Sequence, residues 1–191
     1  GAQRATAASV TRRGVAAPAP AVDMRTYYAG AGGGCFGGDS TVLVSRSAGD
    51  GFEPCRIRHV RAGDRVMVSG GGVALVRCLV RIRRLASKPL IALTDGLTIT
   101  PSHPVRIDGV WRRADAALGA RLVEEHDGCV FTLVLDEAIH ASDHAAQRVL
   151  LVGGVECVTW GHGLLGPVVG HRFFGTHRVL EDVAAMGGWA S

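Results

Sequence analysis

The chain has 191 residues, of which 47% are hydrophobic, and its 21 basic against 17 acidic side chains give a net charge of +4. This length and hydrophobic content fit one folded domain with a tail and exclude a disordered protein. Because the arginines are scattered and aromatic residues make up only 5%, no basic stripe or stacking surface for nucleic acid is predicted.

Two parts of different composition follow one another along the chain. Residues 1–34 are rich in alanine, glycine and proline and lack helical or strand periodicity, which predicts a flexible upstream flank. Residues 35–191 contain short runs of β-branched and apolar residues separated by glycine-rich turns, which predicts one domain of short strands. The predicted strands are 41–44, 55–60, 65–68, 73–84, 91–93, 97–100, 105–107, 110–112, 130–135, 149–152 and 155–160.

Two hairpins and one long strand are the most distinct of these elements. Asp95-Gly96 and Asp108-Gly109 each join two short apolar runs, and Asp-Gly is a strong hairpin signal. Residues 73–84 alternate apolar and basic side chains, which predicts a strand with one solvent-exposed face.

Helical signals are few. A single turn of helix is expected within 113–119, and residues 176–186 are the best helix candidate, with Val179, Leu180 and Val183 on one face. No strand is followed by a helix long enough for a parallel crossover. The fold class is therefore predicted to be all-β, with one short C-terminal helix.

Cysteine spacing and hydropathy exclude several other classes of protein. The five cysteines are an odd number, and neither a Cys-x-x-Cys pair nor a zinc-like Cys/His spacing occurs, so no metal or cofactor is expected. The most apolar stretch, 149–170, is interrupted by Glu156, His162 and several glycines, so no membrane span is expected.

One cysteine lies between a glycine run and a strand. Structural cysteines are usually buried within an element, whereas Cys35 follows Gly32–Gly34, and glycines let a backbone carbonyl approach closely. Cys35 is therefore a candidate nucleophile for its own peptide bond, at the carbonyl of Gly34. The alternative is an ordinary loop cysteine before a strand.

Attack on a peptide bond requires help at both of its ends. The carbonyl of Gly34 needs hydrogen-bond donors where negative charge develops, and the leaving nitrogen of Cys35 needs a proton. A histidine is suited to supply that proton near neutral pH. The Thr-x-x-His spacing lets one tight turn present Thr100 and His103 together, so Thr100 is expected to orient the peptide and His103 to bond and protonate the nitrogen. Without Cys35, His103 reads as a turn residue that contributes little to the core.

Two further residues are secondary candidates. His162 has a glycine on either side, which indicates backbone held close to another group, so it either serves the site or caps a turn. Cys157 lies in a predicted strand between a glutamate and a valine, and is either a core residue or a second thiol of the site.

The order of these motifs resembles the Hint fold shared by Hedgehog autoprocessing domains and inteins. The resemblance is carried by Cys35-Phe36 before a strand, by Gly63-Asp64 after residues 57–60, and by Thr100-Pro101-Ser102-His103. It is closest to the branch found downstream of von Willebrand factor A domains and covers residues 35 to about 190. The motifs of that branch are 95–104, 157–163, 171–176 and Gly188-Trp189.

The resemblance implies a horseshoe-like fold with pseudo-twofold symmetry and an autocatalytic function. Cys35 is expected to perform an N-to-S acyl shift at Gly34, giving a thioester that water, a small thiol or an amine resolves. The substrate is then the chain's own N-terminal flank, and the domain is a single-turnover, self-cleaving cysteine domain, expected to be a monomer. The competing hypothesis is a non-catalytic Hint-like interaction module.

Two departures from the relatives narrow this expectation. Inteins end in His-Asn, whereas this chain contains no asparagine, so self-splicing is not expected. Hedgehog domains use an aspartate in transfer to a sterol, whereas residues 65–94 contain no carboxylate, and arginine cannot act as a general base. Sterol transfer is therefore not expected either.

Overall fold

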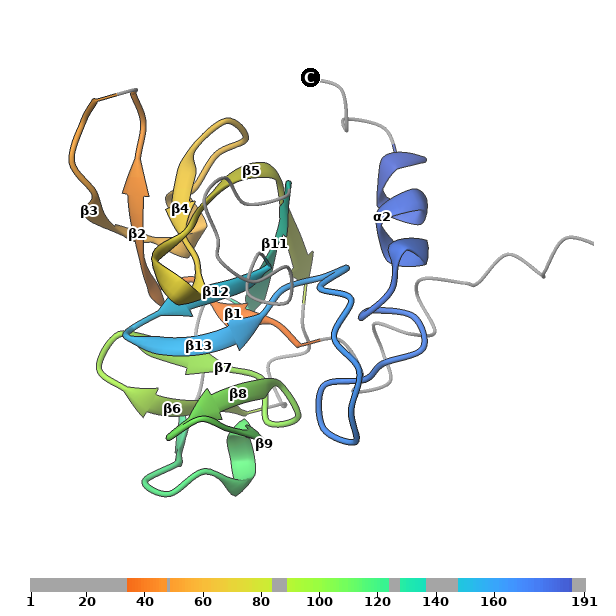
Figure 1. Ribbon diagram of the computed structural model, residues 1–191. Helices are drawn as coiled ribbons and strands as arrows, with labels where there is room; N and C mark the ends of the chain where they lie inside the picture. Colours follow the sequence, from red (N-terminus) through yellow and green to blue (C-terminus); the bar gives the residue numbers. More distant parts are fainter. Residues whose placement is uncertain (1–33, 48, 84–88, 124–127, 137–147, 187–191) are drawn as a thin grey trace, which may run out of the picture.

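The computed structural model describes residues 34–47, 49–83, 89–123, 128–136 and 148–186. Nearly all of the predicted upstream flank, residues 1–33, lies outside the described residues. The described part consists of thirteen strands, three 3-10 turns and one α-helix, which confirms the predicted all-β class (Figure 1).

The elements follow one another in chain order as short strands with a helix at the end. The strands are β1 (Phe36–Gly37), β2 (Thr41–Ser45), β3 (Glu53–Arg56), β4 (Arg65–Met67), β5 (Val73–Arg83), β6 (Leu90–Thr94), β7 (Leu97–Ile99), β8 (Pro104–Ile107), β9 (Val110–Arg113), β10 (Arg121–Val123), β11 (Cys129–Leu135), β12 (Val149–Val152) and β13 (Val155–Val158). The 3-10 turns are η1 (Ile57–His59), η2 (Ser69–Gly71) and η3 (Ala114–Ala116), and the helix is α2 (His177–Ala184).

Most predicted elements are present, and one strand is replaced by a turn. Both Asp-Gly hairpins form, as β6–β7 and β8–β9, and the long alternating strand is β5. The strand predicted over 55–60 ends at Arg56, and η1 follows. Ile57 and Val60 are both buried, and residues three apart lie on one face of a 3-10 turn but on opposite faces of a strand.

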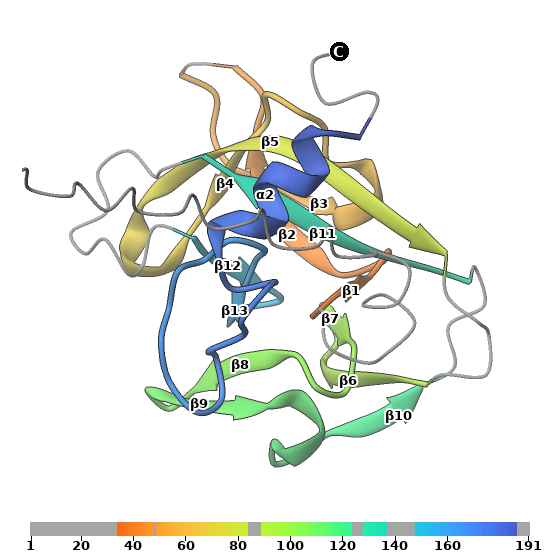
Figure 2. The same ribbon diagram turned by 90° about the vertical axis from the view of Figure 1, so that its right-hand side faces the viewer.

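The strands form one strongly curved sheet. Hydrogen-bonded neighbours run in the order β10-β6-β7-β1-β11-β5-β4-β2-β12-β13-β8-β9, and β3 pairs with β2 (Figures 1 and 2). Strands β7 and β8 lie near opposite ends of this order, yet only residues 100–103 connect them. The sheet therefore curls back on itself, and the turn of residues 100–103 lies where its two ends meet.

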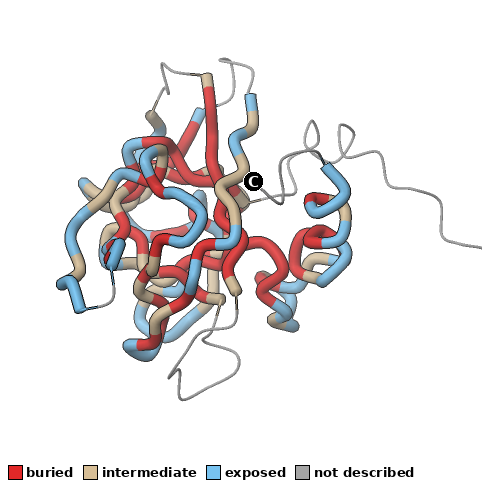
Figure 3. The backbone as a smooth tube through the Cα atoms, turned by 90° about the horizontal axis from the view of Figure 1, so that it is seen from above, coloured by how far each residue is buried: buried red, intermediate tan, exposed pale blue. Residues whose placement is uncertain are grey.

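Buried side chains form a main core, a second cluster against α2 and a smaller third cluster that contains Cys35. Figure 3 shows burial along the inner strands and on the side of α2 that faces the sheet. Val179, Leu180 and Val183 of α2 are buried against Trp160 and Val134, which confirms the predicted apolar face of this helix. The helix approaches closely at Gly161, where a Cβ atom would lie 2.8 Å from Leu180. Members of the main core include Phe36, Ile57, Leu97, Leu133, Leu150 and Cys157.

Candidate functional site

Strand pairing places Cys35 directly opposite Thr100. In the antiparallel pair β1–β7, Phe36 lies opposite Ile99. Cys35, which precedes Phe36, therefore faces Thr100, which follows Ile99. The N–H of Thr100 donates to the carbonyl of Cys35 at 2.9 Å. The N–H of Cys35 donates to Oγ1 of Thr100 at 3.0 Å. Thr100 therefore binds both backbone polar groups of Cys35.

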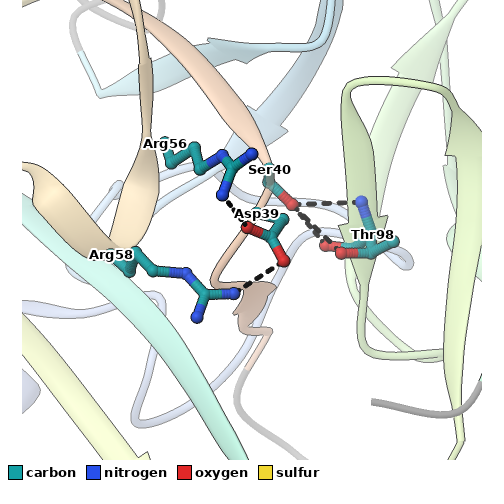
Figure 4. Close-up of polar contacts among 5 residues, drawn as sticks. All are labelled: Asp39, Ser40, Arg56, Arg58 and Thr98. Atoms are coloured by element: carbon teal, nitrogen blue, oxygen red, sulfur yellow. Dashed lines mark hydrogen bonds and ion pairs between the residues drawn. The ribbon is translucent and has the colours of Figure 1, made fainter. Parts of the chain in front are cut away.

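The loop after β1 is fixed on both sides, as Figure 4 shows. Ser40, which is 1% exposed, donates its hydroxyl to the carbonyl of Thr98 at 2.8 Å and accepts the N–H of Thr98 at 3.0 Å. Asp39 forms ion pairs with Arg56 at 3.2 Å and Arg58 at 2.7 Å. The Ser40 bonds tie this loop to β7 and help to hold the register that places Cys35 opposite Thr100, whereas the Asp39 ion pairs tie the loop to β3 and η1. Sequence reasoning missed Ser40, because a serine at a turn before a strand has many ordinary explanations.

The turn of residues 100–103 presents a fully buried histidine. The N–H of His103 donates to the carbonyl of Thr100 at 3.0 Å, and Pro101 has the φ that the second position of such a turn requires. The side chain of His103 is 0% exposed, and its ring lies 4.7 Å from that of Phe36. The expectation of a turn histidine that contributes little to the core is therefore wrong, since the closure of the sheet buries this turn.

Hydrogen bonding and burial define the protonation state of His103. Nε2 lies 2.9 Å from the carbonyl of Val158, and a carbonyl only accepts, so Nε2 carries the proton. Nδ1 makes no hydrogen bond within the described residues. Burial is the largest effect on His103 and lowers its pKa to about 4. The backbone of Val158 and of Cys35 raises this pKa, and nearby His162 lowers it. At neutral pH the imidazole is thus uncharged, with a lone pair on Nδ1.

The ring of His103 lies directly against Gly34. A Cβ atom on Gly34 would lie 2.5 Å from Nδ1 and 2.6 Å from Cγ of His103, so this approach requires glycine. The available lone pair is therefore beside the residue whose carbonyl is the expected point of attack. The N–H of Cys35 donates to Oγ1 of Thr100, and the backbone of Cys35 also interacts with His103, whose pKa it raises.

The side chain of Cys35 lies in an apolar cluster. It is 4% exposed and packs with Leu90 and Val130, and the partly buried Ile82 and Val123 complete the cluster. The candidate nucleophile is thus shielded from solvent beside the bond that it is expected to attack.

A cavity of about 180 Å³ adjoins Gly34 on the side of His162 and His171. Nδ1 of His162 accepts the N–H of Leu164 at 2.9 Å, and Nδ1 of His171 accepts the N–H of Phe174 at 2.9 Å. Burial lowers the pKa of His162 to about 4, and burial also lowers the pKa of His171. The remaining residues that line the cavity are Ser102, Pro104, Val158, Thr159, Trp160, Val168, Val169, Gly170 and Phe174.

The structure does not bring Cys157 to this site. It is 0% exposed within the main core, where burial raises the pKa of its thiol far above the usual range. Asp64, beside Gly63 in the turn before β4, accepts the N–H of Arg61 at 2.9 Å and is 6% exposed. Its carboxylate therefore stabilises the turn before β4, and β4 is not a neighbour of β7 in the sheet.

Neither a metal centre nor a membrane-spanning helix is found among the described residues. No group of three or more His, Cys, Asp or Glu side chains there is arranged to hold a metal ion. No helix among the same residues is long and apolar enough to cross a bilayer.

Comparison with known proteins defines the family. A family model described as Hint-domain (Vint) matches residues 34–191. The chain therefore belongs to the Hint-domain family, and the expected Hint fold is confirmed. The expected position downstream of a von Willebrand factor A domain stays a prediction.

Structural neighbours are inteins with low sequence identity. The crystal structure of gp41-1 intein is 12% identical, with a TM-score of 0.46 over 67% of this chain and 100% of that chain. A DnaB intein from Synechocystis sp. PCC 6803 is 13% identical, with a TM-score of 0.45 over 66% of this chain and 98% of that chain. No curated protein matches the chain significantly.

Proposed function

We propose that this domain cleaves its own chain at the Gly34–Cys35 bond through a thioester on Cys35. Hint domains are associated with autoprocessing, and the chain belongs to that family. The observation that carries the proposal is the position of the bond, between Oγ1 of Thr100, which binds the nitrogen of Cys35, and the ring of His103, which lies against Gly34.

The first step is attack by the thiol of Cys35 on the carbonyl carbon of Gly34. The new C–S bond forms as the carbonyl π electrons move onto the oxygen, which gives a tetrahedral oxyanion, and the thiol proton passes to Nδ1 of His103. A neutral imidazole suits this step, because its pKa of about 4 leaves the Nδ1 lone pair available at neutral pH. His103 therefore acts first as a base, which refines the expectation that it acts only as an acid.

In the second step the oxyanion re-forms the carbonyl and the C–N bond breaks. The imidazolium of His103 is a strong acid in its buried setting, and it returns the proton to the nitrogen of Cys35, which leaves as an amine. The N–H of Cys35 remains on Oγ1 of Thr100 throughout, so the lone pair that develops on the nitrogen is turned away from Thr100. The product is a thioester between Gly34 and the sulfur of Cys35, with a free amino group on Cys35.

The third step transfers the upstream segment to an acceptor. Water, a small thiol or an amine adds to the thioester carbonyl, and the sulfur of Cys35 leaves and recovers a proton. The upstream segment then ends at Gly34 as an acid, a thioester or an amide. Each molecule reacts once, since its own chain is the substrate.

Incubation of the purified chain with dithiothreitol or hydroxylamine, followed by intact-mass spectrometry, tests this function. Both reagents are expected to accelerate loss of residues 1–34, because they consume the thioester. Cys35→Ala should abolish the effect, while the control Cys55→Ala, at a partly exposed cysteine of β3, should retain it. If Cys35→Ala and the unaltered chain behave alike in both reagents, the domain is the non-catalytic interaction module.

A further inference from the structure

We infer that the cavity beside Gly34 binds the acceptor of the upstream segment, and that this acceptor is a small, uncharged thiol with a short apolar body. The inference rests on the proposed function and specifies which of the possible acceptors the domain takes. Three properties of the cavity carry it: its position, its size and the charge of its walls.

The cavity and the sulfur of Cys35 both lie next to Gly34, but different residues surround them. Gly34 and Ser102 line the cavity, whereas the side chain of Cys35 packs with Leu90 and Val130, and none of these three residues lines it. An acceptor must add to the thioester carbonyl while the sulfur of Cys35 departs, so it needs an approach that the sulfur does not occupy. The cavity provides that approach.

The volume of the cavity fits a molecule of a few heavy atoms. About 180 Å³ is more than ten times the roughly 10–15 Å³ that a cavity needs to hold one water molecule, and it lies below the roughly 300 Å³ at which pockets for drug-sized ligands begin. Sterols and large peptides are therefore too big for it.

The walls favour an uncharged occupant. Val158, Trp160 and Phe174 provide apolar surface, and no carboxylate, lysine or arginine of the described residues lines the cavity. His162 and His171 both accept a backbone N–H at Nδ1, so their neutral rings carry the proton at Nε2 and act as donors, not bases. A charged acceptor would lose its hydration without gaining a counter-ion.

Among common nucleophiles, a thiol meets these conditions best at neutral pH. A thiol with a pKa near 8.5 is mostly uncharged there, whereas a primary amine is mostly a cation and an alcohol is a weak nucleophile. The reaction forms a bond between the incoming sulfur and the Gly34 carbonyl carbon and breaks the bond to the sulfur of Cys35. Because a thiolate is the attacking species, Nδ1 of His103, which lies beside Gly34, takes the proton of the incoming thiol and then gives it to the departing sulfur of Cys35. No oxidant or reductant takes part.

The test measures cleavage of the full chain against the concentration of four thiols. Ethanethiol is small and uncharged, 2-mercaptoethanesulfonate is anionic, cysteamine is cationic and glutathione is large. The rate with ethanethiol is expected to saturate and, at equal thiolate concentration, to exceed the other three by at least about tenfold, the equivalent of 1.4 kcal/mol. Each rate is divided by the hydroxylamine rate of the same protein, which reports how much thioester forms.

A pair of variants in one loop separates binding in the cavity from reaction in solution. Val168→Trp fills the cavity, because Val168 lines it, whereas Leu165→Trp adds the same side chain at a neighbouring residue that is 93% exposed. Only Val168→Trp is expected to remove saturation by ethanethiol.

Two results would overturn the inference, and they differ in what they say about the proposed function. Linear dependence on all four thiols, with equal behaviour of both tryptophan variants, would show that the cavity does not bind the acceptor while the proposed function stands. Absence of hydroxylamine cleavage in the unaltered chain would remove the proposed function and the acceptor site with it.

Discussion

The ring of His103 contacts Gly34 so closely that a Cβ atom at residue 34 would lie 2.5 Å from Nδ1. This contact joins the turn of residues 100–103 to the residue before β1. Because Nε2 of the same ring is fixed on the carbonyl of Val158 at 2.9 Å, the ring has no freedom to rotate away without breaking that bond. The requirement for glycine before Cys35 is thus a property of the site and not of the flank.

Gly34→Ala is expected to slow thiol-induced cleavage by about 10- to 100-fold, since overpacking a closed site typically costs about 1–3 kcal/mol. The rate of fragment formation by intact mass measures the effect. Gly51→Ala is the matched control, because a Cβ atom there meets nothing within 4 Å. Equal rates for the two variants would show that His103 does not need its observed position.

Thr100→Val keeps the shape of the side chain but removes the acceptor of the Cys35 N–H. Cleavage is expected to slow by tenfold or more, because an unsatisfied buried donor costs about 1–3 kcal/mol and the nitrogen loses its orientation. Thr100→Ser retains the hydroxyl and should keep most of the rate. A Thr100→Val variant as fast as Thr100→Ser would remove Thr100 from the mechanism.

Ser40→Ala removes both hydrogen bonds to Thr98 and should loosen the register of β1 on β7. The free energy of unfolding in urea is expected to fall by about 1–3 kcal/mol, and cleavage should slow with it. Ser47→Ala, at an exposed serine of the β2–β3 loop, is the control and should change neither quantity. If Ser40→Ala loses stability but keeps the full cleavage rate, the register of β1 is held by other contacts.

His103→Ala is expected to slow cleavage by about two to four orders of magnitude, the usual range for a positioned acid–base group. It should also destabilise the fold, because the lost side chain is 0% exposed and contacts Phe36. His59→Ala, at an exposed histidine of η1, is the control for both measurements. Cleavage within threefold of the unaltered rate would assign the proton transfer to another group, with His162 the nearest candidate.

Acid should destabilise the domain between about pH 6.5 and pH 4. His103 and His162 have pKa values of about 4 in the fold, below the ordinary value of 6.5, so the unfolded chain binds protons first as the pH falls. Their contribution is complete above pH 6.5 and is lost toward pH 4, by up to about 3 kcal/mol for each. Urea unfolding from pH 7.5 to pH 4.5 measures the slope, which should be shallower in His162→Gln. An unchanged slope in that variant would mean that His162 titrates normally.

The sequence predicted the fold wherever a pattern extended over several residues. The alternation along residues 73–84, the Asp-Gly hairpins and the apolar face of 176–186 all depend on local periodicity, and the structure contains each of them. Strand β1 has only two residues, so it carries no periodicity, and it forms because β7 and β11 pair with it from either side.

For the candidate site, the sequence supplied residues but not their surroundings. Thr100 and His103 were found from their spacing, whereas the burial of His103 depends on the sheet closing around residues 100–103. The role of Ser40 depends on a contact with Thr98, 58 residues further along the chain. Neither long-range contact leaves a local signature in the sequence.

The position of β1 also determines what remains after the reaction. Cleavage would make Cys35 the first residue of the domain, one residue before a strand paired on both sides by β7 and β11. Newly created chain ends usually fray, but this one would begin inside the sheet. We therefore expect the spent domain to melt as the uncut domain does, and the upstream segment to leave by transfer to its acceptor without any unfolding of the domain.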